Sequence, residues 1–366
     1  MSLQQEIDSA RGEIKTDSYA MSIGEWMSLY ASNEIDIHPE FQRIYRWEEG
    51  QKSRFIESLL LGIPIPPIFV AQRENGVWDV VDGLQRLSTI FEFAGVLKNE
   101  EGETQPPLKL EKTKYLPTLE GKYWQLDSDP ANSFDVAQRL LIKRTKIGVS
   151  IILKESDSRS KFELFQRLNT GGSKLSEQEV RNCLLVMINK EFYRWLVSLA
   201  TLQPFRDVVA LTDRALKEKY DMEIALRFLV FRKLGENELQ QIGDVGEFLT
   251  EEMIKLATNP DYDLDGEKRL FEQLFGFINT NLGQDAFKRW VAEDAKFKGG
   301  FLVSAFETVA IGMGYWLPNH VTEQQFAEKV MALWGNTEFT ENSGSGIRAS
   351  TRIPKTVSLG RRLFRV

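Results

Sequence analysis

The residues whose types and spacing best suggest chemistry are Asp82, Gly83, Leu84, Gln85 and Arg86, between a predicted strand at 77–81 and a predicted helix at 84–96. A glycine here can adopt a positive φ and lets a ligand approach the backbone. The helix start presents free N–H groups and the positive end of the helix dipole. An arginine in this first turn opposes the dipole, so Arg86 is not placed there for helix stability, and its guanidinium suits a phosphate. We therefore predict a phosphate-binding site at this turn. The simpler alternative is that Asp82 caps the helix and Arg86 pairs with a surface carboxylate.

A second cluster lies upstream, where Gln42, Arg43, Tyr45, Arg46 and Trp47 fall within six residues of a predicted extended segment. Aromatic side chains interleaved with arginines can stack on bases and pair with phosphates. Alternation along a strand would place Arg43 on the face of the two aromatic residues. A buried arginine there needs a partner or a ligand. The alternative is an edge strand whose aromatic residues face the core.

A third candidate is the loop at 169–174, with the sequence Asn-Thr-Gly-Gly-Ser-Lys. It is not a P-loop, because Lys174 is followed by Leu175 rather than by serine or threonine. A simple connector between helices is the alternative.

The chain has two histidines, His38 and His320. A zinc or HNH nuclease needs more histidines in defined positions, so the sequence argues against such a nuclease within this chain.

The helices and strands that the sequence predicts around these residues indicate an α+β fold. Apolar spacing predicts helices at about 21–31, 48–61, 84–96 and 157–168, and strands at 65–72, 77–81 and 146–153, with a turn at Asn75 and Gly76 and loops at 98–133. Ser176 and Glu179 form a capping box that starts a helix to about 189. Helical patterns dominate from 190 to 335. We expect domains at 1–155 and 156–335, and a basic tail at 336–366. The tail has no acidic residue after Glu341, and its cations are Arg348, Arg352, Lys355, Arg361, Arg362 and Arg365.

Composition narrows the class of protein. The net charge of −7 disfavours a protein that coats DNA by its bulk positive charge. The single cysteine, Cys183, excludes an intrachain disulfide and fits a reducing compartment. The longest apolar run, at 59–71, is too short to span a membrane and contains three prolines. We therefore expect a cytoplasmic protein without a membrane segment.

Three motifs in this order resemble the domain of unknown function 262 family, which includes the GmrS half of the modification-dependent GmrSD restriction enzymes. The first combines Gln42, Arg43, Tyr45 and Trp47 with Gln51, and the second is the run at 81–89 around the turn. The third block contains Phe165, Asn169, Gly171, Leu175, Glu179 and Arg181. The resemblance covers residues 35–185.

The resemblance implies a ParB-like, sulfiredoxin-like N-terminal domain, here followed by a mostly α-helical domain, and a turn that binds or hydrolyses a nucleoside triphosphate with Mg²⁺. Leu84 stands where the family usually has glutamine. The implied catalytic residues are Asp82, Gln85 and Arg86. The implied nucleotide-binding residues are Gln42, Arg43, Tyr45, Trp47, Gln51, Asp82, Gly83, Gln85 and Arg86. The second-block pocket would use Asn169, Gly171 and Lys174.

Relatives pair this domain with an HNH-type nuclease, either fused or as a partner. The two histidines of this chain argue against such a nuclease within it. The resemblance therefore implies a regulatory or sensing protein of a DNA-directed restriction or anti-phage defence system, with DNA and a separate nuclease subunit as partners and self-association left open. The alternative is a non-enzymatic adaptor that binds DNA or a protein partner. The basic tail of such an adaptor would contact DNA phosphates. The other interpretation of the tail is that its positive charges only offset the negative net charge of the rest of the chain.

Overall fold

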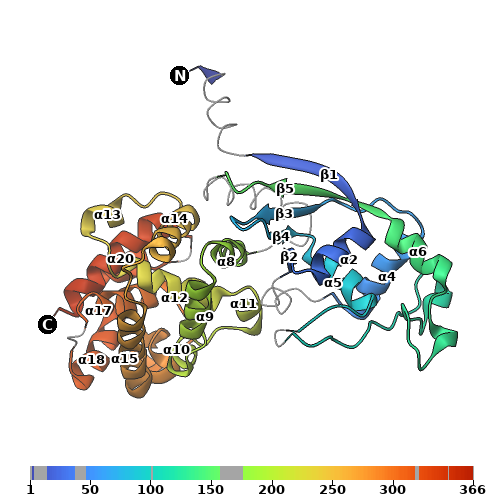
Figure 1. Cartoon of the computed structure of the whole chain (residues 1–366). Helices are drawn as coiled ribbons and strands as arrows, with labels where there is room; N and C mark the ends of the chain where they lie inside the picture. Colours follow the sequence, from blue (N-terminus) through green and yellow to red (C-terminus); the bar gives the residue numbers. More distant parts are fainter. Residues whose placement is uncertain are drawn as a thin grey trace. The chain divides into compact units, whose positions relative to one another are not determined.

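The computed structural model describes residues 2–3, 15–37, 47–99, 102–156, 176–317, 321–344 and 346–365. It divides into two compact units, Met1–Lys174 and Leu175–Val366. The first unit combines a sheet with helices and the second is mostly helical (Figure 1). The predicted α+β fold class is confirmed. Within the described part of the chain, no helix is both long and apolar enough to cross a membrane.

The first unit is built on a five-stranded sheet with the order β1-β5-β3-β4-β2. The β3 and β4 strands form an antiparallel hairpin, and β3 pairs in parallel with β5. The strands have these bounds: β1 Thr16–Ser22, β2 Ile35–Asp36, β3 Ile68–Gln72, β4 Trp78–Asp82 and β5 Lys146–Ile152. The hairpin turn contains Gly76 at a φ of 86°, as the predicted Asn-Gly turn requires.

Four helices of this unit pack on one another beside the sheet (Figure 1). They are α2 Ile23–Ala31, α4 Glu49–Leu60, α5 Leu84–Phe93 and α6 Val136–Arg144. In α5 the apolar residues Leu87, Ile90 and Phe91 are all buried, which confirms the predicted amphipathic face. This burial fixes the α5 helix against the core and so fixes the turn at its start.

The long connection between α5 and α6 is loop-like, as predicted, with short 3₁₀ helices at Pro117–Leu119 (η1) and Pro130–Asn132 (η2). It is attached to α4 through the buried carboxylate of Glu57. One oxygen of that carboxylate accepts hydrogen bonds from the backbone N–H groups of Tyr115 and Leu116, both at 2.9 Å, and from the Thr113 hydroxyl.

We expect Glu57→Ala to lower the free energy of unfolding by about 2–4 kcal/mol, because three partly or fully buried donors would lose a charged acceptor. Urea denaturation measures this change. Glu120→Ala, which removes an exposed glutamate from the same connection, should change stability by less than about 0.5 kcal/mol. Equal effects of the two substitutions would contradict the role given to Glu57.

The second unit opens with α8 Glu177–Ile188. Its N-cap is Ser176 and its capping box with Glu179 is confirmed. Around the buried helix α12 Tyr220–Phe231 lie the longer helices α9 Lys190–Ala200, α14 Val245–Thr258, α15 Leu264–Leu282, α18 Glu323–Ala332 and α20 Ala349–Leu363. The shorter elements are α10 Gln203–Val209, α11 Asp213–Lys217, α13 Glu236–Gln240, α16 Val303–Phe306, a π-helical segment Glu307–Ile311, α17 Gly312–Gly314, α19 Thr337–Asn342 and the strands β6 Arg289–Val291 and β7 Lys296–Lys298.

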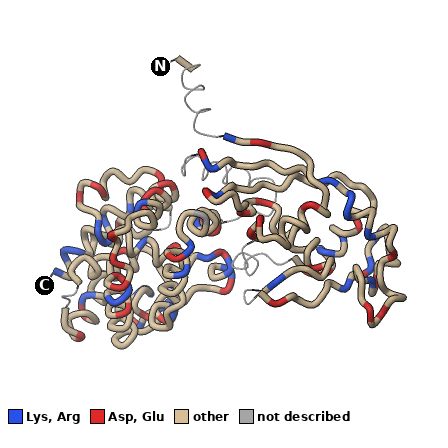
Figure 2. The backbone as a smooth tube through the Cα atoms, viewed as in Figure 1, with Lys and Arg blue, Asp and Glu red and all other residues tan. Residues whose placement is uncertain are grey.

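The segment predicted as a basic tail, 336–366, instead contains α19 and α20, and α20 packs closely in the helical unit. A Cβ on Gly360 would lie 1.9 Å from the carbonyl oxygen of Thr308, so only glycine permits this helix contact. Arg352 pairs with buried Glu307, and Arg361 is 5% exposed. The sequence does not reveal this packing because the acidic partners lie far away in the chain. Figure 2 shows positive and negative residues interspersed over this unit.

Candidate functional site

The predicted phosphate-binding turn is a strand-to-helix turn centred on Gly83. Strand β4 ends at Asp82 and helix α5 begins at Leu84, with Gly83 between them at φ 94° and ψ 11°. A Cβ on Gly83 would lie 2.3 Å from Cδ1 of Ile68. Both the positive φ and the lack of space therefore require glycine, as the sequence predicts.

We expect Gly83→Ala to destabilise the first unit by about 1–3 kcal/mol, because alanine is strained at positive φ and would displace Ile68. It should also disturb Arg86, whose Nη2 atom lies 3.1 Å from the position of the added Cβ. Thermal unfolding measures the loss. Gly76→Ala is the control, since Gly76 also has a positive φ but no atom within 4 Å of an added Cβ. A cost for Gly83→Ala no greater than that of the control would show that packing around Gly83 is unimportant.

Asp82 does not cap α5, so the capping alternative is wrong. The N-cap is Gly83, and no side chain of the described residues makes the capping hydrogen bond. The Asp82 Oδ2 atom instead accepts a hydrogen bond from Arg86 Nη2 at 2.7 Å. Asp82 is 52% exposed and Arg86 is 11% exposed at the side chain. Arg86 thus pairs with an exposed carboxylate, as the simpler alternative expected, but this carboxylate belongs to the turn itself.

Arg86 is held in place by backbone carbonyl groups that the sequence analysis does not identify. Its Nη1 atom donates to the carbonyl oxygen of Pro66 and, at 3.1 Å, to that of Pro67. Burial lowers the pKa of the Arg86 guanidinium, an effect that Asp82 opposes, and an arginine remains charged in either case. The proline-rich run before β3 is the only sequence signal for this contact. The guanidinium is therefore oriented before any ligand arrives.

Gln85 links the turn to the start of α4. Its Oε1 atom accepts a hydrogen bond from the backbone N–H of Trp47 at 3.0 Å, and the Trp47 ring packs edge-on against Phe55. The structure therefore brings Trp47 next to the turn. Gln51 uses its side-chain oxygen to accept a hydrogen bond from the backbone of Glu48, so this oxygen caps α4.

The other predicted site residues lie outside the described part of the chain: Gln42, Arg43, Tyr45, Asn169, Gly171 and Lys174. Two residues of the third motif are described. Glu179 belongs to the α8 capping box, and Arg181, fully buried, pairs with Glu223 at 2.6 Å. These two residues therefore stabilise the helical unit. The described residues contain no group of three His, Cys, Asp or Glu side chains that could hold a metal ion.

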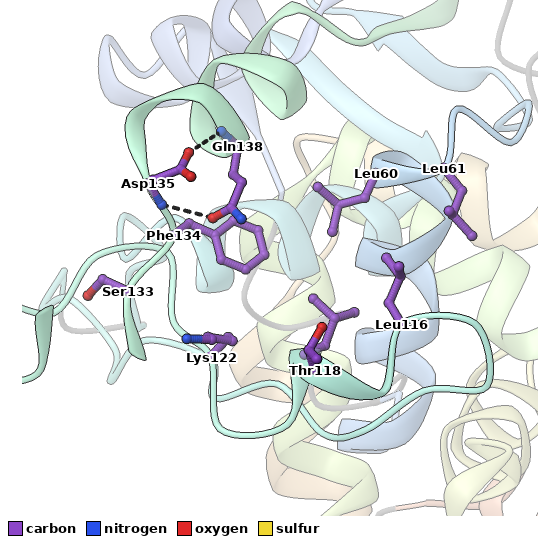
Figure 3. A pocket seen from close by; sticks show the side chains of 10 residues that line it. Leu60, Leu61, Leu116, Thr118, Lys122, Ser133, Phe134, Asp135 and Gln138 are labelled. Carbon is purple, nitrogen blue, oxygen red and sulfur yellow. Dashed lines mark hydrogen bonds between the residues drawn. The ribbon is translucent and has the colours of Figure 1, made fainter. Parts of the chain in front are cut away.

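A cavity of about 510 Å³ lies elsewhere in the first unit, between the end of α4 and the start of α6 (Figure 3). Leu60 and Leu61 line one side of it, and Asp135 and Gln138 line another. The two polar residues hydrogen-bond to each other's backbone in the α6 capping box. None of the predicted site residues lines this cavity. Lys122 and Ser133, which also line it, donate to backbone carbonyl groups of the connection between α5 and α6. Most of its polar side chains are thus engaged within the chain, so it is a weaker candidate than the turn.

The described residues define an α+β protein in which a largely buried arginine stands at a strand-to-helix turn. The family model of the GmrSD restriction endonuclease N-terminal domain matches residues 23–186, a segment that includes this turn and α8. The match supports the resemblance to GmrS-like proteins and indicates a component of a restriction or anti-phage defence system. The domain of unknown function 262 and ParB-like assignments stay predictions. No curated protein and no solved structure matches the chain.

Proposed function

We propose that the chain is a nucleotide-binding regulatory or sensing component of a restriction system, and that the phosphates of a nucleoside triphosphate bind at residues 82–86. The observation that carries the proposal is the oriented, largely buried guanidinium of Arg86 beside the start of α5. Burying a cation is costly, and the only described carboxylate that pairs with Arg86 is that of the half-exposed Asp82, which favours an anionic ligand as a further partner.

The start of α5 supports anion binding in its own right. Gly83 carries no capping side chain, and the first turn of the helix contains no acidic residue. The first backbone N–H groups of a helix have no intrahelical acceptor, so a phosphate oxygen can accept from them. The guanidinium has five N–H donors. Those not engaged by Pro66, Pro67 and Asp82 can contact the same phosphate.

Asp82 provides a place for Mg²⁺ next to these phosphates. Magnesium usually binds through one or two carboxylates together with phosphate oxygens and water. Asp82 is half exposed, and only one of its oxygens accepts the described bond from Arg86. We propose that the carboxylate helps to hold a phosphate-bound Mg²⁺. Hydrolysis of the nucleotide would use Asp82, Gln85 and Arg86.

The GmrSD match supports the remaining parts of the proposal. The chain would act with a separate nuclease subunit on DNA, its own two histidines being too few for an HNH centre. The alternative of an adaptor that binds DNA through the C-terminal cations is less favoured. Arg352 and Arg361, two of the six, are engaged inside the helical unit.

Isothermal titration of the whole chain with ATP, GTP and CTP in the presence of Mg²⁺ tests the proposal. We expect saturable binding of at least one of the three, with an affinity that falls when Mg²⁺ is chelated. Release of inorganic phosphate, followed in parallel, separates hydrolysis from binding alone. Failure of all three nucleotides to bind would overturn the proposal.

A further inference from the structure

Strand β1 forms a long, exposed edge of the five-stranded sheet. It pairs with β5 from Thr16 to Ser22, and no described strand pairs with its other side. The first five residues of β1 are exposed, including Tyr19 at 47%. Long edges are usually protected by lysine, proline or a bulge, because their free backbone groups can pair with another strand. Strand β1 has none of these three features, and Asp17 is its only charged residue.

The backbone groups of β1 point alternately toward β5 and away from the sheet. The N–H of Leu153 donates to the carbonyl oxygen of Lys15 at 2.9 Å, just before β1 begins. Just after β1 ends, the N–H of Ile23 donates to the carbonyl oxygen of Thr145 at 2.9 Å. In an antiparallel pair, the backbone groups of every second residue bond to the same neighbouring strand. The groups that face β5 therefore belong to residues 17, 19 and 21, and those that face outward belong to residues 16, 18, 20 and 22.

The outward N–H groups of β1 differ in whether they already have an acceptor. The N–H of Ser22 donates to the Glu25 carboxylate in the α2 capping box, and the N–H of Ser18 donates to the carboxylate of Asp17, both at 2.7 Å. No described residue accepts from the outward N–H groups of Thr16 and Ala20. These two residues lie at equal distances on either side of Ser18. A two-fold axis beside Ser18 therefore places the free groups of Thr16 opposite those of Ala20 in a second copy.

We propose that β1 pairs in antiparallel fashion with β1 of a second copy of the chain, about a two-fold axis beside Ser18. Thr16 and Ala20 exchange N–H and carbonyl bonds with Ala20 and Thr16 of the second copy. The Ser18 N–H exchanges its exposed acceptor, Asp17, for the carbonyl oxygen of Ser18 in the second copy. Asp17 then lies opposite Tyr19 of the second copy, so its carboxylate meets a phenol rather than a second carboxylate. The pairing does not involve residues 82–86, so it stands apart from the proposed nucleotide binding.

Analytical ultracentrifugation of the full chain at increasing concentrations tests the pairing. We expect a monomer at low concentration and a dimer as the concentration rises. Ala20→Pro removes an outward N–H but no bond to β5, and proline is tolerated at such positions of edge strands. It should weaken dimerisation by about tenfold or more, because each copy loses a hydrogen bond to the other. Ala20→Val is the matched control, since it keeps the N–H group and should dimerise like wild type.

Disulfide cross-linking locates the axis and does not depend on the proline variant. With Cys183 replaced by alanine, Ser18→Cys brings two thiols together across the axis, at a Cα separation of about 5.5 Å that a disulfide can span. Thr16→Cys is the control, because its two copies would lie about 13 Å or more apart. We expect mild oxidation to cross-link the Ser18→Cys variant and to leave the Thr16→Cys variant largely unlinked.

Three results would overturn the proposal. The first is a chain that stays monomeric at every concentration. The second is a dimer that Ala20→Pro leaves as stable as wild type. The third is equal cross-linking of the two cysteine variants. In the last two cases the copies would meet at another surface or in another register.

Discussion

Replacement of Arg86 by alanine is expected to weaken the binding of a nucleoside triphosphate by at least about 30-fold. The Arg86 side chain is 11% exposed, and its guanidinium is oriented by two backbone carbonyl groups and by Asp82. A preoriented cation loses little conformational entropy when a phosphate binds, so most of its electrostatic attraction contributes to affinity. Isothermal titration of wild type and variant measures the loss.

Two further variants make this result specific. Arg86→Lys keeps the charge but loses the planar fork of donors, so we expect it to recover part of the affinity only. Arg54→Ala removes an exposed arginine from α4 and should leave binding unchanged. Arg86→Ala also removes the donor to the carbonyl groups of Pro66 and Pro67, so its unfolding midpoint is measured alongside binding. An Arg86→Ala variant that is folded and binds as tightly as wild type would contradict the account.

Glu307→Ala is expected to have the largest effect on stability, a loss of about 3–5 kcal/mol in the helical unit. The Glu307 side chain is fully buried and begins the π-helical segment. Its carboxylate accepts two hydrogen bonds from Arg352, both at 2.9 Å, and one from Thr356. Arg227 Nη1 lies 3.8 Å from the same carboxylate. Removing Glu307 leaves these two arginines without their shared counter-charge.

Urea denaturation measures the effect, and Glu338→Ala provides the control. Glu338 pairs with Arg362 at the surface, where both side chains are about half exposed, so its loss should cost less than about 1 kcal/mol. Nucleotide binding by the folded fraction of Glu307→Ala should be unchanged, because the proposed site belongs to the first unit. Equal stability of the two variants would show that the buried ion cluster contributes little.

The turn was predictable from the sequence because its determinants are local. Gly83 at positive φ, a strand before it and an amphipathic helix after it all follow from spacing and residue type. The role of Asp82 was not predictable, since an aspartate before a helix usually caps it, whereas here the left-handed Gly83 occupies the N-cap position. Whether Asp82 bonds to the helix start or to Arg86 depends on where Pro66 and Pro67 hold the guanidinium.

Other features depend on contacts between distant parts of the chain. Strand β1 lies at the edge of the sheet and is mostly exposed, so its residues show little apolar alternation. It is a strand because it pairs with β5 over seven residues. The burial of α20 likewise depends on Glu307 and on close packing at Gly360, and neither is visible in the basic composition of the segment.

The most direct test of the central claim is a crystal structure of the chain with a non-hydrolysable nucleoside triphosphate and Mg²⁺. The account predicts phosphate oxygens within hydrogen-bonding distance of the Arg86 guanidinium and of the first backbone N–H groups of α5, with Asp82 close to the metal ion. A nucleotide bound elsewhere, such as in the cavity beside Leu61, with residues 82–86 free of phosphate, would contradict it.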